Sequence, residues 1–376
     1  VLALAACEED APKRPVAESI TDRGATATLH EQFRIDGHEA DLVSAWGLAE
    51  AEDGTLAVPQ FEDNEVRLYS AEGVFLDALG GEGEGPGEFQ SVRSVSWRGR
   101  DSLAVYDMSQ RRMTVLPIGR GYPRTVPVGR RPNLSDRTGR FITFARMADD
   151  GSILAQLLET PRETSRTRVE RILVLGPEPG VEREVAVLES PDPKVEVREG
   201  SWAGSAGLPS ANFPAIRLAQ NGSRALVALA NLEGELAGTF GLTALGAAGD
   251  TLFDRRYAFE PIEVRPEYAD SAIEAFAENL APSLATLYRD QAEYPPLRKP
   301  IVDLVDGVDG TIWVALRRSS GERIYTVLDE EGDVVGQVLM PRRVRPDVVA
   351  RSHMWSIEVD QWGVPSLVRY VLEWSG

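Results

Sequence analysis

A polar turn followed at once by a short run of β-branched and apolar residues recurs along this chain of 376 residues. The copies, of which the last is looser than the others, begin at Asp53, Asp101, Asp150, Asn221, Asp309 and Asp360. Three of the five intervals between neighbouring copies are 48, 49 and 51 residues, and the other two are 71 and 88. A unit of this length, with a hairpin turn at a fixed place, is typical of a propeller blade made of four antiparallel strands.

The segments around these turns predict six blades. The first five are expected at about Leu42–Gly80, Phe89–Val128, Phe141–Leu188, Phe213–Phe259 and Ile301–Met340. The last stretch, His353 to Trp374, holds only about three strands, so we expect Ala25–Ile35 to supply the fourth. Such a strand would remove the open edges of the ring. The predicted fold class is therefore all-β, a six-bladed β-propeller over residues 25–376 that is closed by an N-terminal strand.

The two long intervals contain insertions. Residues 189–212 are rich in Pro, Gly and Ser and lack periodicity, which predicts a long surface loop. Residues 262–297, between blades four and five, carry apolar side chains at three- and four-residue steps, which predicts a helical insertion. Ser271 and Glu274 fit a capping box at its start, and Pro282 is expected to kink or divide it. The insertion could simply pack across one face of the ring, or it could cap the central opening and shape a ligand site.

The formal net charge of −19 limits the possible partners. A chain with this excess of acidic residues has no net basic surface with which to neutralise nucleic-acid phosphates. The same charge disfavours binding of the folded body to anionic lipid. We therefore expect no nucleic-acid partner, and membrane attachment only through a lipid anchor.

The first residues predict that anchor. In Val1–Cys7, small residues precede the single cysteine of the chain, and this pattern resembles the lipobox of bacterial lipoproteins. The resemblance implies that residues 1–6 are the tail of a signal peptide and that Cys7 is lipidated. Residues 7–24 would then be a flexible tether, because their first part is polar and proline-rich. The expected location is extracytoplasmic, anchored on the periplasmic or cell-surface face of a bacterial membrane.

A glycine-rich segment carries a second resemblance. Gly80–Phe89 ends in Gly-Pro-Gly-Glu-Phe and looks like the interblade loop of NHL-repeat proteins, although Val92 and Arg93 stand where those proteins usually have a proline. Together with the lipobox, this segment makes the chain similar to six-bladed β-propeller lipoproteins of bacteria over about Ala25 to Trp374. A phosphate-binding role is disfavoured, because the glycine spacing is wrong and the loop contains three glutamates.

Residues suited to catalysis are scarce. The chain has three histidines, and it contains neither an HExxH motif nor a G-x-S-x-G elbow. Asp303, Asp306 and Asp309 form the richest carboxylate cluster, but turn formation explains the last two without a metal. We therefore expect no cofactor and no metal, while calcium or another divalent ion remains an open alternative.

The starts of the inner strands are the expected ligand site, because these strands line the axial channel of a propeller. The candidate binding residues are Trp46, Arg93, Phe144, Phe213, Arg217, Asp303, His353 and Trp355. Aromatic and arginine side chains in this mixture suit a saccharide, a peptide or a small carboxylate. The predicted function is a monomeric binding module for a small molecule, saccharide or protein partner. The alternative is a metal-dependent hydrolase or lyase, lactonase-like, with its site in the central channel.

Overall fold

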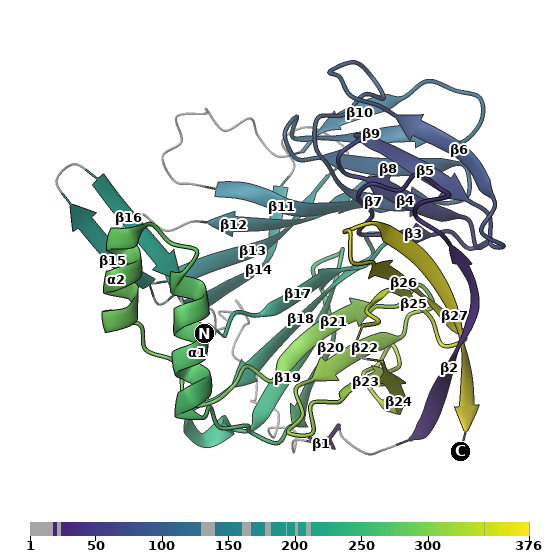
Figure 1. The fold of residues 1–376 in the computed structure, drawn as a ribbon. Coiled ribbons are helices and arrows are strands. Elements are labelled where there is room, and N and C mark those ends of the chain that lie inside the picture. The colour runs from purple at the N-terminus through teal and green to yellow at the C-terminus, as the bar shows by residue number, and fades with distance from the viewer. Residues whose placement is uncertain are drawn as a thin grey trace.

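The computed structural model describes residues 18–20, 24–128, 140–159, 167–176, 182–192, 194–199, 202–207, 212–341 and 343–375. The predicted lipidation site Cys7 and the predicted signal-peptide residues 1–6 lie outside these ranges. Within them, the strands form sheets arranged around a common centre, as in a β-propeller (Figure 1).

Three sheets are meanders of four antiparallel strands. The first contains β3 (Ala49–Glu50), β4 (Leu56–Gln60), β5 (Glu65–Tyr69) and β6 (Phe75–Gly80). The second contains β7 (Val92–Arg98), β8 (Ser102–Asp107), β9 (Arg112–Pro117) and β10 (Arg124–Pro127). The third contains β11 (Arg140–Met147), β12 (Ile153–Glu159), β13 (Thr167–Leu175) and β14 (Glu182–Pro191).

The fourth sheet has the same meander and one additional strand. Its members are β17 (Ala215–Leu218), β18 (Arg224–Asn231), β19 (Thr239–Gly246) and β20 (Thr251–Ala258), with the short 3₁₀ helix Gly234–Leu236 between β18 and β19. The additional strand β1 (Glu18–Ser19) pairs in parallel with β20. Ile20, which follows β1, is fully buried, and its carbonyl oxygen accepts a hydrogen bond from Thr326 Oγ1. Residues 18–20, which the sequence assigned to the flexible tether, are therefore part of the folded body.

Eight further strands form one sheet instead of two separate blades. In spatial order they are β21 (Ile301–Asp306), β22 (Ile312–Leu316), β23 (Arg323–Leu328), β24 (Val334–Met340), β2 (Ala25–Ile35), β27 (Pro365–Ser375), β26 (His353–Val359) and β25 (Pro346–Val349). The two halves join because Ala25–Ala27 of β2 pair in parallel with β24. The rest of β2 pairs antiparallel with β27, which confirms the predicted N-terminal strand beside the C-terminal one.

The segment between β14 and β17 differs from the predicted loop. It contains a hairpin of β15 (Lys194–Glu199) and β16 (Trp202–Gly207), which packs against two helices inserted between β20 and β21. The buried side chains of this lobe come from both parts and are Val195, Ala206, Ala277, Leu284, Ala285 and Tyr288. A hairpin with few apolar side chains gains its stability from this packing, which the local sequence does not reveal.

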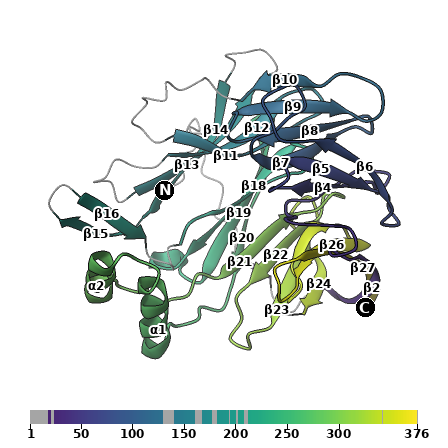
Figure 2. The same ribbon diagram turned by 45° about the horizontal axis from the view of Figure 1, so that its top comes forward.

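The helices are α1 (Pro266–Ala277) and α2 (Pro282–Gln291), so Pro282 divides the insertion as predicted. The predicted capping box is wrong, because Ser271 lies inside α1 and its Oγ donates to the carbonyl of Glu267. In both ribbon views the helices lie at the side of the molecule, away from β7 and β26 (Figures 1 and 2).

The glycine-rich loop connects β6 to β7 and is fixed by side chains of the second sheet. Arg112 donates to the carbonyls of Glu84, Gly85 and Glu88 at 2.6–3.0 Å. Phe89 is fully buried against Gly80, where a Cβ atom would lie 2.6 Å from the Phe89 ring. Gly80 also has a φ of 100°, which disfavours any other residue there.

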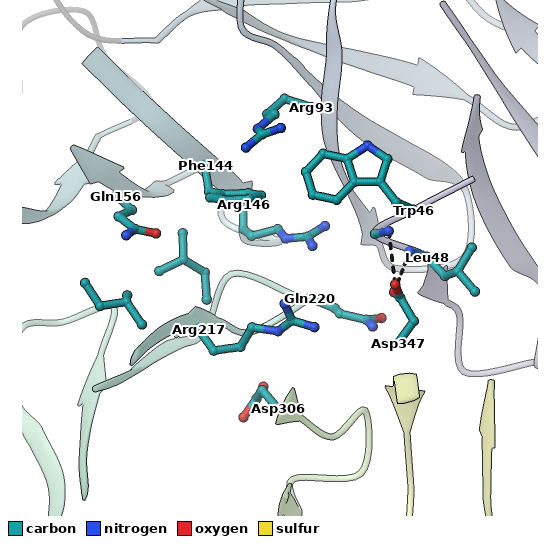
Figure 3. A pocket seen from close by; sticks show the side chains of 13 residues that line it. Trp46, Leu48, Arg93, Phe144, Arg146, Gln156, Arg217, Gln220, Asp306 and Asp347 are labelled. Atoms are coloured by element: carbon teal, nitrogen blue, oxygen red, sulfur yellow. Dashed lines mark hydrogen bonds between the residues drawn. The ribbon is translucent and has the colours of Figure 1, made fainter. Parts of the chain in front are cut away.

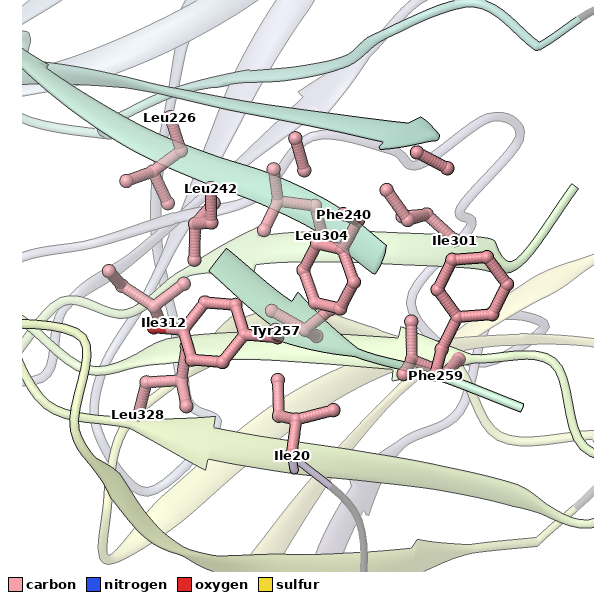
Figure 4. Close-up of a cluster of buried hydrophobic side chains, with 14 of the residues drawn as sticks. Ile20, Leu226, Phe240, Leu242, Tyr257, Phe259, Ile301, Leu304, Ile312 and Leu328 are labelled. Carbon is pink, nitrogen blue, oxygen red and sulfur yellow. The ribbon is translucent and has the colours of Figure 1, made fainter. Parts of the chain in front are cut away.

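The largest apolar cluster lies between the fourth sheet and β21–β23 (Figure 4). It includes Ile20, Phe240, Tyr257, Ile312 and Leu328, all nearly inaccessible to solvent. Other clusters fill the spaces between the remaining neighbouring sheets and between the two halves of the eight-stranded sheet. The sheets are thus joined mainly by apolar packing. Among the described residues, no helix is long and apolar enough to span a membrane.

Candidate functional site

The inner strands of the sheets converge on a cavity of about 660 Å³, which includes solvent at its open mouth (Figure 3). Its lining comes from β11, β12, β17, β21 and β25, together with the start of β7 and the residues before β3. The apolar lining residues are Trp46, Leu48, Phe144, Ile216 and Leu218. The polar lining side chains are Arg93, Arg146, Gln156, Arg217, Gln220, Asp306 and Asp347.

Two of the charged lining residues are positioned by β-bulges. The register between β7 and β8 shifts between Val92 and Ser94, which leaves Arg93 as the extra residue. The register between β25 and β26 shifts in the same way between Pro346 and Val348 and leaves Asp347. A bulge redirects a side chain relative to its neighbours, and here each bulged residue lines the cavity.

Arg93 contacts two aromatic rings that also contact each other. Its guanidinium carbon lies 4.5 Å from the ring centroid of Trp46 and 4.6 Å from that of Phe144. The two rings are 5.9 Å apart at an angle of 68°. Arg93 Nε donates to the carbonyl of Thr143 at 3.2 Å, and burial lowers the Arg93 pKa. This cation–π arrangement fixes Trp46, Arg93 and Phe144 relative to one another.

Arg146 and Arg217 occupy equivalent positions on neighbouring inner strands. Each forms the second-to-last residue pair between its strand and the next strand of its sheet. Arg146 pairs with Leu154 of β12, and Arg217 pairs with Leu226 of β18. Burial and the nearby charge of Arg217 lower the pKa of Arg146 to about 10, so Arg146 is still protonated at neutral pH. The fold therefore places two like charges side by side in the cavity wall.

Two carboxylates also face the cavity. Asp347 accepts hydrogen bonds from the amides of Gly47 at 3.2 Å and Leu48 at 2.8 Å. Burial raises the Asp347 pKa, and the charge of Arg217 and the two amide donors oppose this rise. Asp306 is bound by Arg224, whose Nη2 lies 2.6 Å from Asp306 Oδ1. The site thus combines aromatic rings with three arginines and two aspartates.

Four of the predicted site residues, Trp46, Arg93, Phe144 and Arg217, lie together in this cavity. The other four are not among its lining residues. Phe213 packs against Arg168, whose guanidinium carbon lies 4.5 Å from the centroid of the Phe213 ring. Asp303 accepts a hydrogen bond from the Tyr325 hydroxyl at 2.8 Å.

His353 and Trp355 instead bind a carboxylate of the first sheet. His353 Nε2 lies 2.7 Å from Oε2 of the buried Glu50, and Trp355 Nε1 donates to Oε1 of Glu50 at 3.3 Å. Trp355 is fully buried in the apolar cluster between the first and last parts of the ring. Both residues therefore join sheets in this structure.

Sequence reasoning missed Arg146 and Asp347, and it assigned Asp306 only to a turn. Each is a charged residue within a short apolar strand, and such a residue must find a partner or face a cavity. Asp303, Asp306 and Asp309 each have a separate partner. Asp309 accepts a hydrogen bond from Thr311 Oγ1 at 2.7 Å, Asp303 accepts one from Tyr325, and Asp306 accepts one from Arg224. In the described part of the chain, no group of three or more His, Cys, Asp and Glu is arranged to hold a metal ion.

Comparisons with known proteins support the fold. No protein-family model matches the chain, and no curated protein sequence matches it. A solved structure of a DUF4221 family member from Bacteroides vulgatus is similar with a TM-score of 0.53 and 10% identity, covering 93% of this chain and 99% of that one. A protein of Bacteroides fragilis described as exported matches with a TM-score of 0.48 and 11% identity, over 96% of this chain and 99% of that one.

Virginiamycin B lyase from Staphylococcus aureus matches with a TM-score of 0.42 and 10% identity, covering 92% of this chain and all of the other. At 10% identity, the likeness to the DUF4221 family member concerns the fold and not the activity. The chain is thus a mostly β protein with a propeller-like arrangement of sheets.

Proposed function

We propose that this chain is an extracytoplasmic six-bladed β-propeller lipoprotein that binds a small ligand in its central cavity. The count of six treats the eight-stranded sheet as two blades, since β2 pairs with β27 from Thr26 to Ile35 but with β24 only over Ala25–Ala27. Each half then has four antiparallel strands, as the other blades do.

The lipoprotein assignment rests on the lipobox-like run before Cys7 and on the NHL-like loop Gly80–Phe89. The description of the Bacteroides fragilis neighbour as exported agrees with an extracytoplasmic location. A lipid at Cys7 would hold the body at the membrane and leave the central cavity free for a ligand.

The observation that carries the binding function is the composition of the cavity. Ligand sites are typically concave, with aromatic and apolar walls and a few converging polar groups. Here Trp46 and Phe144 supply aromatic walls, and arginine, aspartate and glutamine side chains converge from several sheets. A channel filled only for stability would have no need for this many charged groups.

Thermal-shift screening of the full chain against a panel of uncharged, cationic and anionic small molecules tests this function. Compounds that raise the melting temperature should be titrated by calorimetry against the wild type and Trp46→Ala. Because Trp46 lines the cavity, Trp46→Ala should weaken binding. Trp362→Ala is the matched control, since Trp362 is 73% exposed and is not a lining residue. If no compound binds, or if both variants bind equally well, the proposed function is wrong.

A further inference from the structure

The charges around the cavity do not balance. Arg93, Arg146 and Arg217 line it together with Asp306 and Asp347. Asp306 already has a cationic partner, because Arg224 binds it through Nε at 2.9 Å and Nη2 at 2.6 Å. Asp347 can offset only one of the three lining arginines. Two positive charges therefore remain in the cavity of a chain whose formal net charge is −19.

The Arg146 side chain lacks a partner that its burial requires. Arg146 is 9% exposed, and its Nη1 is inaccessible to solvent and has no hydrogen-bond partner among the described residues. In Figure 3 its guanidinium points into the cavity, as does that of Arg217. A buried guanidinium without an acceptor is costly, and a second arginine beside it increases the repulsion. The presence of both arginines therefore indicates that the cavity can bind a hydrogen-bond acceptor.

The chemistry of the missing acceptor follows from these groups. Guanidinium groups bind carboxylate and phosphate oxygens through charge-assisted, frequently bidentate hydrogen bonds. The two arginine charges that lack a carboxylate partner would be neutralised by a ligand with two negative charges. The third arginine, Arg93, contacts the rings of Trp46 and Phe144 and lines the same cavity.

We infer that the ligand of the central cavity is a small dianion, with its charge on carboxylate or phosphate oxygens, bound between Arg146 and Arg217 and next to Arg93. This inference rests on the proposed function, and it adds the chemical class of the ligand and the residues that select it. Asp347, tied to the amides of Gly47 and Leu48, lies near both arginines and limits the charge that the site accepts.

Calorimetry on the full chain at low ionic strength tests the inference directly. The probes are succinate and inorganic phosphate as dianions, acetate as a monoanion and putrescine as a cation. We expect a dianion to bind more tightly than acetate, and putrescine not to bind. Succinate binding without phosphate binding would indicate a dicarboxylate, and the reverse result would indicate a phosphate compound.

Arg146→Met and Arg217→Met should each weaken dianion binding by about tenfold or more, because each removes a charge-assisted hydrogen-bond donor. Arg289→Met is the matched control. It removes the same charge from a helix outside the cavity, where Arg289 pairs with Glu274, and it should leave binding unchanged.

The melting temperature of the unliganded protein gives a second, independent readout. If Arg146 is kept for a ligand, Arg146→Met removes an unpartnered buried charge and should raise the melting temperature while it weakens dianion binding. A lower melting temperature for Arg146→Met would show that Arg146 supports the fold, and it would overturn the inference.

The outcomes separate this inference from the proposed function. A neutral ligand whose affinity depends on Trp46 but not on Arg146 or Arg217 would refute the dianion and leave the binding function standing. Absence of binding by every compound in the panel and by both dianions would refute both proposals.

Discussion

Arg224 and Asp306 form a buried ion pair in the wall of the cavity, with Arg224 Nη2 2.6 Å from Asp306 Oδ1. Arg224 comes from β18 and Asp306 from β21, so the contact joins two different sheets. The same Nη2 donates to the carbonyl of Gly310 at 2.8 Å. Because both side chains are more than nine-tenths buried, water cannot readily replace either partner.

Arg224→Met should destabilise the protein strongly. The methionine fills much of the space of the arginine stem but leaves the Asp306 carboxylate buried without its cation. Removing one partner of a buried ion pair typically costs about 3–5 kcal/mol. Urea denaturation of the wild type and the variant would measure the change in the free energy of unfolding.

Arg289→Met is a suitable control for this measurement, because the Arg289–Glu274 pair is exposed and exposed ion pairs contribute little. Equal losses of stability in the two arginine variants would mean that burial of the Arg224–Asp306 pair is not what makes it important.

The same pair predicts a dependence on pH. Burial raises the pKa of Asp306 from its ordinary value of 3.8 to about 6, although Arg224 opposes the rise. Between these values the folded protein binds the proton more tightly than the unfolded chain does. The contribution of Asp306 to the free energy of unfolding therefore falls as the pH rises from about 4 to about 6.

Asp306→Asn lacks this titration. The melting temperature of the variant minus that of the wild type should become more positive between pH 4 and pH 7. Scanning calorimetry of both proteins across this range measures the difference. A constant difference, or one that becomes more negative as the pH rises, would contradict the raised pKa.

Patterns in the sequence predicted the hairpin turns and the strand that closes the ring. The Asp-Gly turns recur because several hairpins between the first two strands of a sheet contain a residue with positive φ, as Gly54, Gly151 and Gly310 show. The sixth copy, at Asp360, lies instead between β26 and β27. The closing strand Ala25–Ile35 was predicted correctly as the partner of the C-terminal strand. The expected three strands in His353–Trp374 were wrong in detail, because this stretch holds only β26 and β27, and β25 precedes it. Trp46 and Arg93 lie near the starts of inner strands, as expected, whereas Phe144 and Arg217 lie further along β11 and β17.

The remaining features depend on contacts between distant segments. Ile20 follows a polar, proline-rich stretch, and only its packing against the fourth sheet and β23 shows that it belongs to the core. Glu50 approaches His353 and Trp355 only after the ring has closed. Arg146 and Asp347 are single charges in apolar strands, and their proximity depends on how the third sheet and the eight-stranded sheet converge on the cavity. The spacing of residues along the chain does not predict these contacts.

The predicted anchor can be tested at Cys7, which lies outside the described residues. Because a lipobox cysteine carries the acyl chains, Cys7→Ser should abolish acylation and release the body from the membrane fraction. Fractionation of bacterial cells that express each form, with metabolic labelling by a fatty acid, measures both effects. A Cys7→Ser protein that remains fully in the membrane fraction would disprove the lipoprotein assignment.

The closing strand should be essential for stability, whereas the segment near the anchor should not. Deletion of Ala25–Ile35 would leave β27 with an unpaired edge and remove the buried side chains of Ala27 and Ile35. Such an exposed edge favours aggregation, so we expect a markedly lower melting temperature and concentration-dependent light scattering. Deletion of Glu8–Pro15 is the control of similar length, and it should change neither quantity. Equal melting temperatures for the two deletions would show that the N-terminal strand does not contribute to the stability of the ring.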